Sequence, residues 1–128
     1  MRLKILSELK YDRDGLVAAV IQDDTNNEIL MVGYMNTEAI KETLTSGRVC
    51  FWSRSRQKLW IKGETSGHTQ TVKSIAVDCD GDALLIKVEQ KVAACHVGYR
   101  SCFFREVSPD GESTRVVGEK IFDADAVY

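Results

Sequence analysis

The 128-residue sequence has little proline, no long apolar run and no large excess of charge of one sign. One proline and nine glycines exclude a collagen-like chain and leave little room for a disordered one. The longest apolar run, Leu16 to Ile21, is far shorter than the ~20 residues that span a bilayer. A net charge of -2 argues against binding a polyanion through overall charge, so nucleic acid would need a local basic patch.

The first ten residues mix charged side chains with isoleucine and leucine, which is not the pattern of a secretory signal peptide. We therefore expect a cytoplasmic protein with no membrane partner. The length lies below the ~150 residues usually allotted to one domain, so a single domain over residues 1–128 is expected. Hydrophobic residues at 44% and charged residues at 28% are ordinary for a globular fold.

One helix is expected among segments that are typical of strands. Residues 16–22 and 28–35 are rich in Val, Ile and Leu, and the polar residues between them favour a turn, which predicts a hairpin. A helix of about ten residues is predicted next, with Asn36 or Thr37 as its N-cap and Gly47 at its end.

The rest of the chain continues the strand pattern. Residues 108–111 predict a turn that leads into an ambiguous polar stretch. The fold class is therefore α+β and strand-dominated, with antiparallel or mixed sheets and one short helix. The further strands are expected at residues 49–53, 59–62, 69–78, 83–89 and 102–107.

Four cysteines in a short chain suggest either disulfides in a secreted domain or thiolate metal ligands inside a cell. Cys79, Cys95 and Cys102 lie among polar or glycine residues, whereas Cys50 lies between two apolar residues and is expected in the core. Without a secretory signal, metal binding by the first three is favoured, and inert thiols and disulfides remain the alternatives.

Three thiolates and a water molecule are the ligands of an open, catalytic zinc site. A fourth protein ligand, His96 or His68, would close the site and make it structural. The spacing alone leaves both possibilities open.

An aspartate cluster, formed by Asp78, Asp80 and Asp82, alternates with Cys79. In extended backbone the carboxylates would project to one side and the cysteine to the other. Such oxygen ligands suit Mg²⁺ or Ca²⁺, and the alternative is a solvated acidic turn. An EF-hand is disfavoured because Ala83 occupies the position of the invariant glycine and a strand follows.

Residues 51–70 are basic and aromatic at first and then rich in glycine. Arginine can bind phosphate through two hydrogen bonds, and glycine-rich loops offer backbone N–H groups to it. A phosphorylated substrate is therefore predicted, with a solvated basic face as the alternative. The candidate substrate-binding residues are Arg54, Arg56, Lys62, Gly63, Thr65, Ser66 and Gly67.

Three stretches, FWSRSRQKLWIKGETSGHTQ, DCDGDALL and ACHVGYRSCFF, resemble in their order and spacing the phosphoribosyl-AMP cyclohydrolase family of histidine biosynthesis. The resemblance covers roughly residues 16–107 and implies a monofunctional enzyme without the fused pyrophosphohydrolase domain of some relatives. It implies that zinc-activated water opens the N1–C6 bond of the adenine ring of 1-(5-phosphoribosyl)-AMP. The product would be the formimino aminoimidazole carboxamide ribonucleotide.

The same resemblance implies the cofactors Zn²⁺ and Mg²⁺ and an intertwined homodimer. In the family, zinc is shared across the dimer, with Cys79 from one chain and Cys95 and Cys102 from the other. The aspartate cluster would bind Mg²⁺. Proton transfer needs a general acid or base, for which His96 is the first candidate and His68 the second, although each could instead be structural.

Two other classes of zinc protein are disfavoured. A zinc nucleobase deaminase would carry an H-x-E and a P-C-x-x-C motif, and neither is present. A zinc module that binds nucleic acid would carry paired C-x₂-C knuckles and usually a positive net charge, and this chain has neither.

Overall fold

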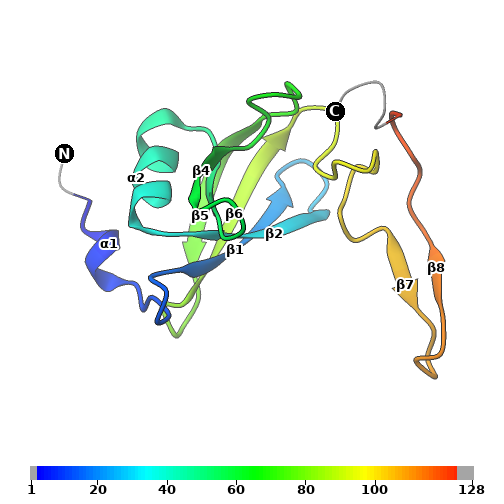
Figure 1. Ribbon diagram of the computed structural model, residues 1–128, viewed down its shortest axis with the longest axis horizontal. Helices are drawn as coiled ribbons and strands as arrows, with labels where there is room; N and C mark the ends of the chain where they lie inside the picture. Colours follow the sequence, from blue (N-terminus) through cyan, green and yellow to red (C-terminus); the bar gives the residue numbers. More distant parts are fainter. Residues whose placement is uncertain (1–2, 124–128) are drawn as a thin grey trace.

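A four-stranded mixed sheet lies at the centre of the molecule (Figure 1). The computed structural model describes residues 3–123. Its helices are α1 (Ile5–Glu8) and α2 (Thr37–Ser46). Its strands are β1 (Val17–Asp23), β2 (Ile29–Met35), β3 (Cys50–Ser53), β4 (Lys58–Ile61), β5 (Gln70–Val77), β6 (Ala83–Gln90), β7 (Arg105–Val107) and β8 (Thr114–Val116).

The central sheet has the order β2-β1-β6-β5, in which β1–β2 and β5–β6 are antiparallel and β1–β6 is parallel. Alternate residues of β1 and β6 are buried, and the buried pair Ile21 and Ile86 are register partners. Because successive side chains of a strand point to opposite faces, this alternation places the core on one face of the sheet.

Helix α2 begins and ends where the sequence predicts. The Ala39 N–H donates to the side chain of Asn36 at 2.9 Å, and Gly47 ends the helix with a left-handed φ of 74°. Its buried residues are Ala39, Ile40 and Thr43, which pack against the start of the β3–β4 hairpin. The predicted helix and the Asn36 cap are therefore confirmed.

Strands β2 and β3 approach each other closely at Gly33. A Cβ atom on Gly33 would lie 2.4 Å from Cδ1 of the Phe51 ring, which is too close for any side chain. The Phe51 ring also packs at 5.5 Å from the Trp60 ring, measured between centroids. These contacts hold the two-stranded β3–β4 sheet against the edge strand of the central sheet.

Two features of the predicted fold are wrong in detail. Besides α2 there is a second helix, the single turn α1, which is too short to show a helical period in the sequence. Residues 102–104 are not strand, because the Cys102 N–H donates to the Leu30 carbonyl at 2.7 Å and the Phe103 N–H to Ser101 Oγ at 2.9 Å. The other expected strands and the mixed sheet are confirmed.

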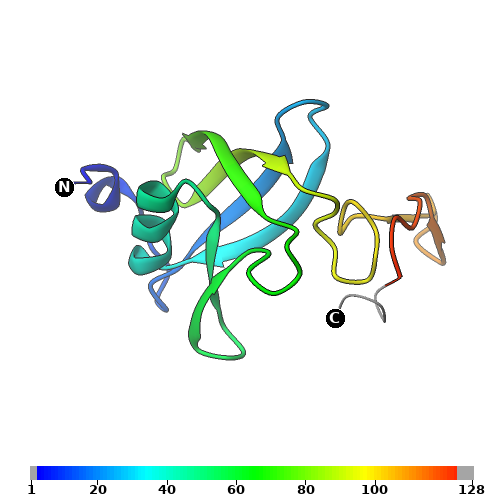
Figure 2. The same cartoon turned by 90° about the horizontal axis from the view of Figure 1, so that it is seen from above.

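The hairpin β7–β8 forms around the predicted turn at residues 108–111 and takes its second strand from the ambiguous polar stretch. It projects at the end of the molecule opposite to the two helices, as Figures 1 and 2 show. Neither helix within residues 3–123 has the length and hydropathy needed to span a bilayer.

Candidate active site

The aspartate cluster lies in the turn that joins β5 to β6. One carboxylate oxygen from each of its three residues lies within 4.8 Å of the others. The backbone here is a turn between the two expected strands rather than an extended segment, and the Asp82 N–H closes it by donating to the Asp78 carboxylate at 3.0 Å. The turn therefore brings the three carboxylates close together. In an extended strand the same three residues would be spread along the strand.

The crowding of these carboxylates has an electrostatic consequence. The hydrogen bond with the Asp78 side chain, followed by the negative charge of Asp78, raises the pKa of Asp82. A bound cation would remove this repulsion, and exposed carboxylate oxygens are ligands that Mg²⁺ prefers. The donor set therefore fits a hard divalent cation.

The loop after β6 brings two of the cysteines together. Cys95 is buried, whereas Cys102 is exposed as a residue. Burial of the Cys102 sulfur, followed by the nearby Cys95 side chain, raises the pKa of Cys102 to about 11. Two converging sulfurs supply half of a tetrahedral zinc site.

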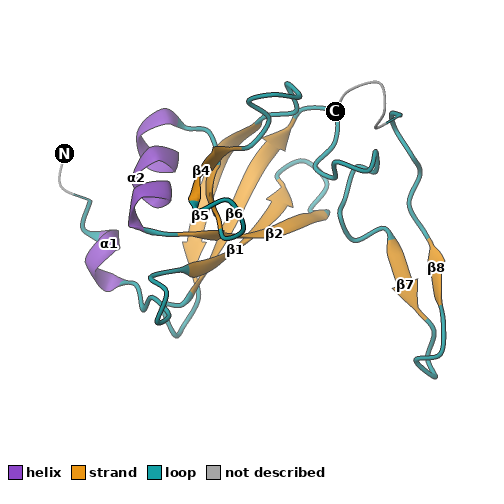
Figure 3. Cartoon of the chain, viewed as in Figure 1, coloured by secondary structure: helices purple, strands orange, loops and turns teal. Residues whose placement is uncertain are grey.

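Cys79 lies far from this pair within one chain. It occupies the turn before β6, whereas Cys95 follows the other end of that strand. Figure 3 shows β6 as an extended strand of the central sheet. The eight residues of β6 span about 26 Å at the usual rise of a strand. Among the described residues, only the aspartate cluster forms a group of three potential metal ligands.

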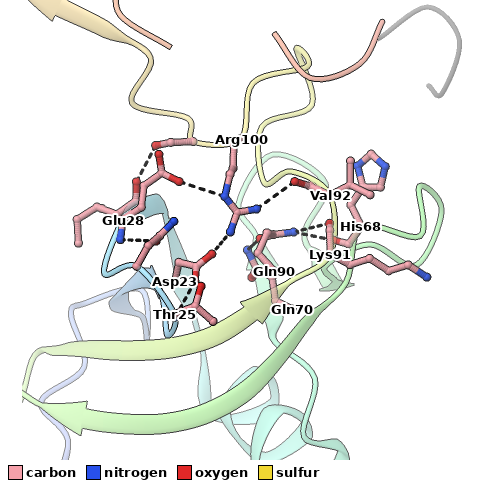
Figure 4. Close-up of polar contacts among 12 residues, drawn as sticks. Asp23, Thr25, Glu28, His68, Gln70, Gln90, Lys91, Val92 and Arg100 are labelled. Atoms are coloured by element: carbon pink, nitrogen blue, oxygen red, sulfur yellow. Dashed lines mark hydrogen bonds and ion pairs between the residues drawn. The ribbon is translucent and has the colours of Figure 1, made fainter. Parts of the chain in front are cut away.

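Arg100 anchors the loop that carries Cys95 and Cys102 (Figure 4). Its guanidinium forms ion pairs with Asp23 and, at 3.2 Å, with Glu28. It also donates to the Val92 carbonyl at 3.1 Å. Asp23 lies at the end of β1 and is only 1% exposed. The Arg100–Asp23 ion pair therefore connects the loop to the β1–β2 hairpin, and its carboxylate is shielded from water.

Residues next to Cys102 extend this anchor. Ser101 Oγ donates to the Ile29 carbonyl at 2.6 Å, and the Cys102 N–H donates to the Leu30 carbonyl. Sequence reasoning missed Arg100 and Ser101 as positioning residues. The one signal in the sequence was Asp23, whose place in the alternating pattern of β1 puts an acidic side chain in the core and so indicates that it needs a partner.

We expect Arg100→Met to lower the free energy of unfolding by about 3–5 kcal/mol, because it leaves the buried Asp23 carboxylate without its cationic partner, with only the hydrogen bonds from Thr25. The matched control is Arg115→Met, which removes an exposed pair with Glu106 and should cost at most about 1 kcal/mol. Urea unfolding of the three proteins measures the difference. Equal stabilities for the two variants would contradict the anchoring role.

The two candidate histidines lie in different environments. His96 is exposed next to Cys95. His68 is buried, with its ring edge-on to Phe122 at 4.8 Å between centroids. Burial, followed by the charges of Lys62 and Lys91, lowers the pKa of His68, so its imidazole is neutral at pH 7 and able to accept a proton.

Arg54 and Arg56 line an open cavity of about 710 Å³ between β2 and the β3–β4 hairpin. The Arg54 guanidinium lies 4.0 Å above the centre of the Tyr34 ring. Aromatic walls and two arginines suit a purine nucleotide that carries phosphate.

The glycine-rich loop at residues 63–67 does not line this cavity. Its Gly67 N–H donates to the Gly63 carbonyl at 2.8 Å, and Ser66 Oγ accepts from the His68 N–H at 3.2 Å. Thr65 is exposed on the same loop. The structure therefore separates the arginines from the loop, and some of the donors that we expected for phosphate are engaged within the loop itself.

Lys62 and Gln90 join this loop to the cysteine loop. Lys62 Nζ donates to the Ala94 carbonyl at 2.6 Å. Gln90 Nε2 donates to the His68 carbonyl at 3.4 Å, as Figure 4 shows. The Trp60 ring lies 5.1 Å from Lys62 Nζ and 5.8 Å from the Arg56 guanidinium carbon. Trp60 lines the cavity that holds the two arginines, so Lys62 connects the wall of this cavity to the loop that carries Cys95 and Cys102.

Comparisons with known proteins point to one family. The model of the phosphoribosyl-AMP cyclohydrolase family matches residues 31–104. The phosphoribosyl-AMP cyclohydrolase of Salinibacter ruber is 52% identical over 97% of this chain and 96% of its own. That of Bifidobacterium adolescentis is 60% identical over 91% of this chain and 84% of its own. The histidine biosynthesis bifunctional protein HisIE of Thermoanaerobacter pseudethanolicus is 52% identical over 97% of this chain and 56% of its own.

Proposed function

The chain belongs to the phosphoribosyl-AMP cyclohydrolase family, and we propose that it opens the adenine ring of 1-(5-phosphoribosyl)-AMP at the N1–C6 bond by hydrolysis. The product is the formimino aminoimidazole carboxamide ribonucleotide of histidine biosynthesis. The observation that carries the proposal is the pair of thiols, Cys95 and Cys102, in a loop that Lys62 and Trp60 connect to a cavity with two arginines.

Zinc is the metal that this thiol pair suits best. Within one chain the pair lacks the third thiolate, because Cys79 lies at the far end of β6. A second copy of the chain would supply Cys79, so the proposal requires a homodimer with the site at its interface. Zinc bound there supplies Lewis acidity that lowers the pKa of water toward neutrality.

Other residues of this chain bind and orient the substrate. Arg54 and Arg56 hold a phosphate at the open end of the cavity, with the purine ring against its aromatic wall. The aspartate cluster binds Mg²⁺, which anchors the second phosphate or orders the site. His96 or His68 moves protons between water and the ring nitrogens.

Ultraviolet difference spectroscopy tests the proposed reaction. Adding 1-(5-phosphoribosyl)-AMP to the purified protein should change the spectrum with turnover, as the purine chromophore is converted to an aminoimidazole. AMP is the control, because it lacks the N1 substituent that makes C6 electrophilic, and its spectrum should not change. Release of ammonia, or binding without any spectral turnover, would contradict ring opening.

A further inference from the structure

Lys62 is a buried cation with an unusual set of neighbours. Its residue is 4% exposed, and its Nζ donates to the Ala94 carbonyl. None of the carboxylates within residues 3–123 forms an ion pair with it. An ammonium group without an anionic partner is costly to bury, so its retention in the core calls for a compensating negative charge.

The groups that would carry the compensating charge are the two thiols of the cysteine loop, which Lys62 reaches through the Ala94 carbonyl and which become anionic when they bind a metal. Burial lowers the pKa of Lys62, and ionised Cys102 and Cys95 would act in the opposite direction. Lys62 also lies outside the lining of the arginine cavity, where a substrate-binding lysine would be expected. Its position therefore favours a role toward the thiols over the substrate contact that the sequence indicates.

We propose that Lys62 is a positioning residue of the metal site, which holds the backbone beside Cys95 and balances the negative charge of the Cys95 and Cys102 thiolates. The inference rests on the proposed function, because it assumes that the two thiols bind a metal. Three thiolates around one Zn²⁺ leave a single negative charge, which one ammonium cancels. The hydrogen bond to the Ala94 carbonyl fixes the residue that precedes Cys95.

Metal binding by Lys62 variants tests the proposal without relying on activity. The metal-free full-length protein is titrated with Co²⁺, whose thiolate charge-transfer absorption reports ligation by cysteine. Lys62→Gln should weaken the Co²⁺ affinity by about 10–100-fold and shift the absorption band, because an amide keeps a donor for Ala94 but carries no charge. Lys62→Arg, which keeps the charge, should bind within about threefold of the wild type.

The matched control is Lys58→Met, an exposed lysine on β4, the strand that precedes Lys62, and its Co²⁺ affinity should not change. Metal-free Lys62→Gln should unfold at the wild-type temperature or above it, because a buried charge without a carboxylate partner has been removed. If Lys62 were merely structural, metal-free Lys62→Gln would unfold at a lower temperature than the wild type. The Co²⁺ affinity of its folded form would then equal that of the wild type.

The outcomes separate this inference from the function on which it rests. If wild-type protein shows no thiolate absorption with Co²⁺, the proposed metal site is wrong. If the wild type binds Co²⁺ and folded Lys62→Gln binds it equally well, the role of Lys62 is wrong while the site stands. Unchanged metal affinity with a raised KM would instead make Lys62 a substrate-binding residue and would also overturn the inference.

Discussion

Mixing a Cys79→Ser chain with a Cys95→Ser chain is expected to restore activity that neither chain has alone. Cys79 precedes β6 and Cys95 follows its other end, and the strand between them is about 26 Å long, so we expect no zinc ion to join them within one chain. In a dimer with shared sites, a mixed dimer has one site with both lesions and one site with none. After full exchange of equal amounts, about a quarter of all sites are intact.

Each variant alone should lose nearly all activity, because every site then lacks one thiolate. The measurement is the rate of ring opening before and after exchange of chains, with exchange itself followed by native mass spectrometry. Two samples of the same variant, mixed in the same way, serve as the control. Demonstrated exchange without any recovery would argue against a site shared between two chains.

Asp80→Asn is expected to retain its zinc and lose most of its activity. The change removes one charge from the aspartate cluster, whose oxygens lie within 4.8 Å of one another, and leaves all thiols intact. A loss of at least about tenfold is expected, with partial recovery at raised Mg²⁺ if weaker Mg²⁺ binding is the main defect. Metal analysis and activity assays over a range of Mg²⁺ concentrations measure both effects.

Asp110→Asn is the matched control for this change. Asp110 is also an exposed aspartate in a tight turn, where it accepts hydrogen bonds from Ser108 Oγ and the Glu112 N–H, but it lies in the β7–β8 hairpin. The activity of the Asp110→Asn variant and its response to Mg²⁺ should match those of the wild type. Loss of zinc from Asp80→Asn, or activity indifferent to Mg²⁺, would show that the aspartate cluster is no separate magnesium site.

The local structure could be predicted from the sequence because its causes are local. The Asn36 cap, the left-handed Gly47 and the turn residues between β1 and β2 each act within one turn of chain. The alternation of β1 and β6 similarly reports which face of each strand is buried. The family resemblance likewise rests on motifs that can be read in order along the chain, and the comparisons confirm it.

What the sequence could not determine depends on contacts between distant segments. The spacing of the aspartates left open whether residues 78–82 are extended or form a turn, and the structure has a turn in which the Asp82 and Ala83 N–H groups donate to the Asp78 carboxylate. Arg100 reaches Asp23 and Lys62 reaches Ala94 only because the sheet brings their loops together. The acidic Asp23 at a core position of β1 indicates that a partner is needed, but no pattern in the sequence identifies the partner, since spacing along a chain does not give distance across a fold.

The sequence by itself therefore determined the elements, the family and the residue types that suit zinc, magnesium and phosphate. Only the tertiary structure decided which of those residues meet. It brought Cys95 and Cys102 together and kept Cys79 at the other end of a strand. The physical reason is that a β-strand is rigid and extended, so residues at its two ends are held apart however close they lie in the sequence.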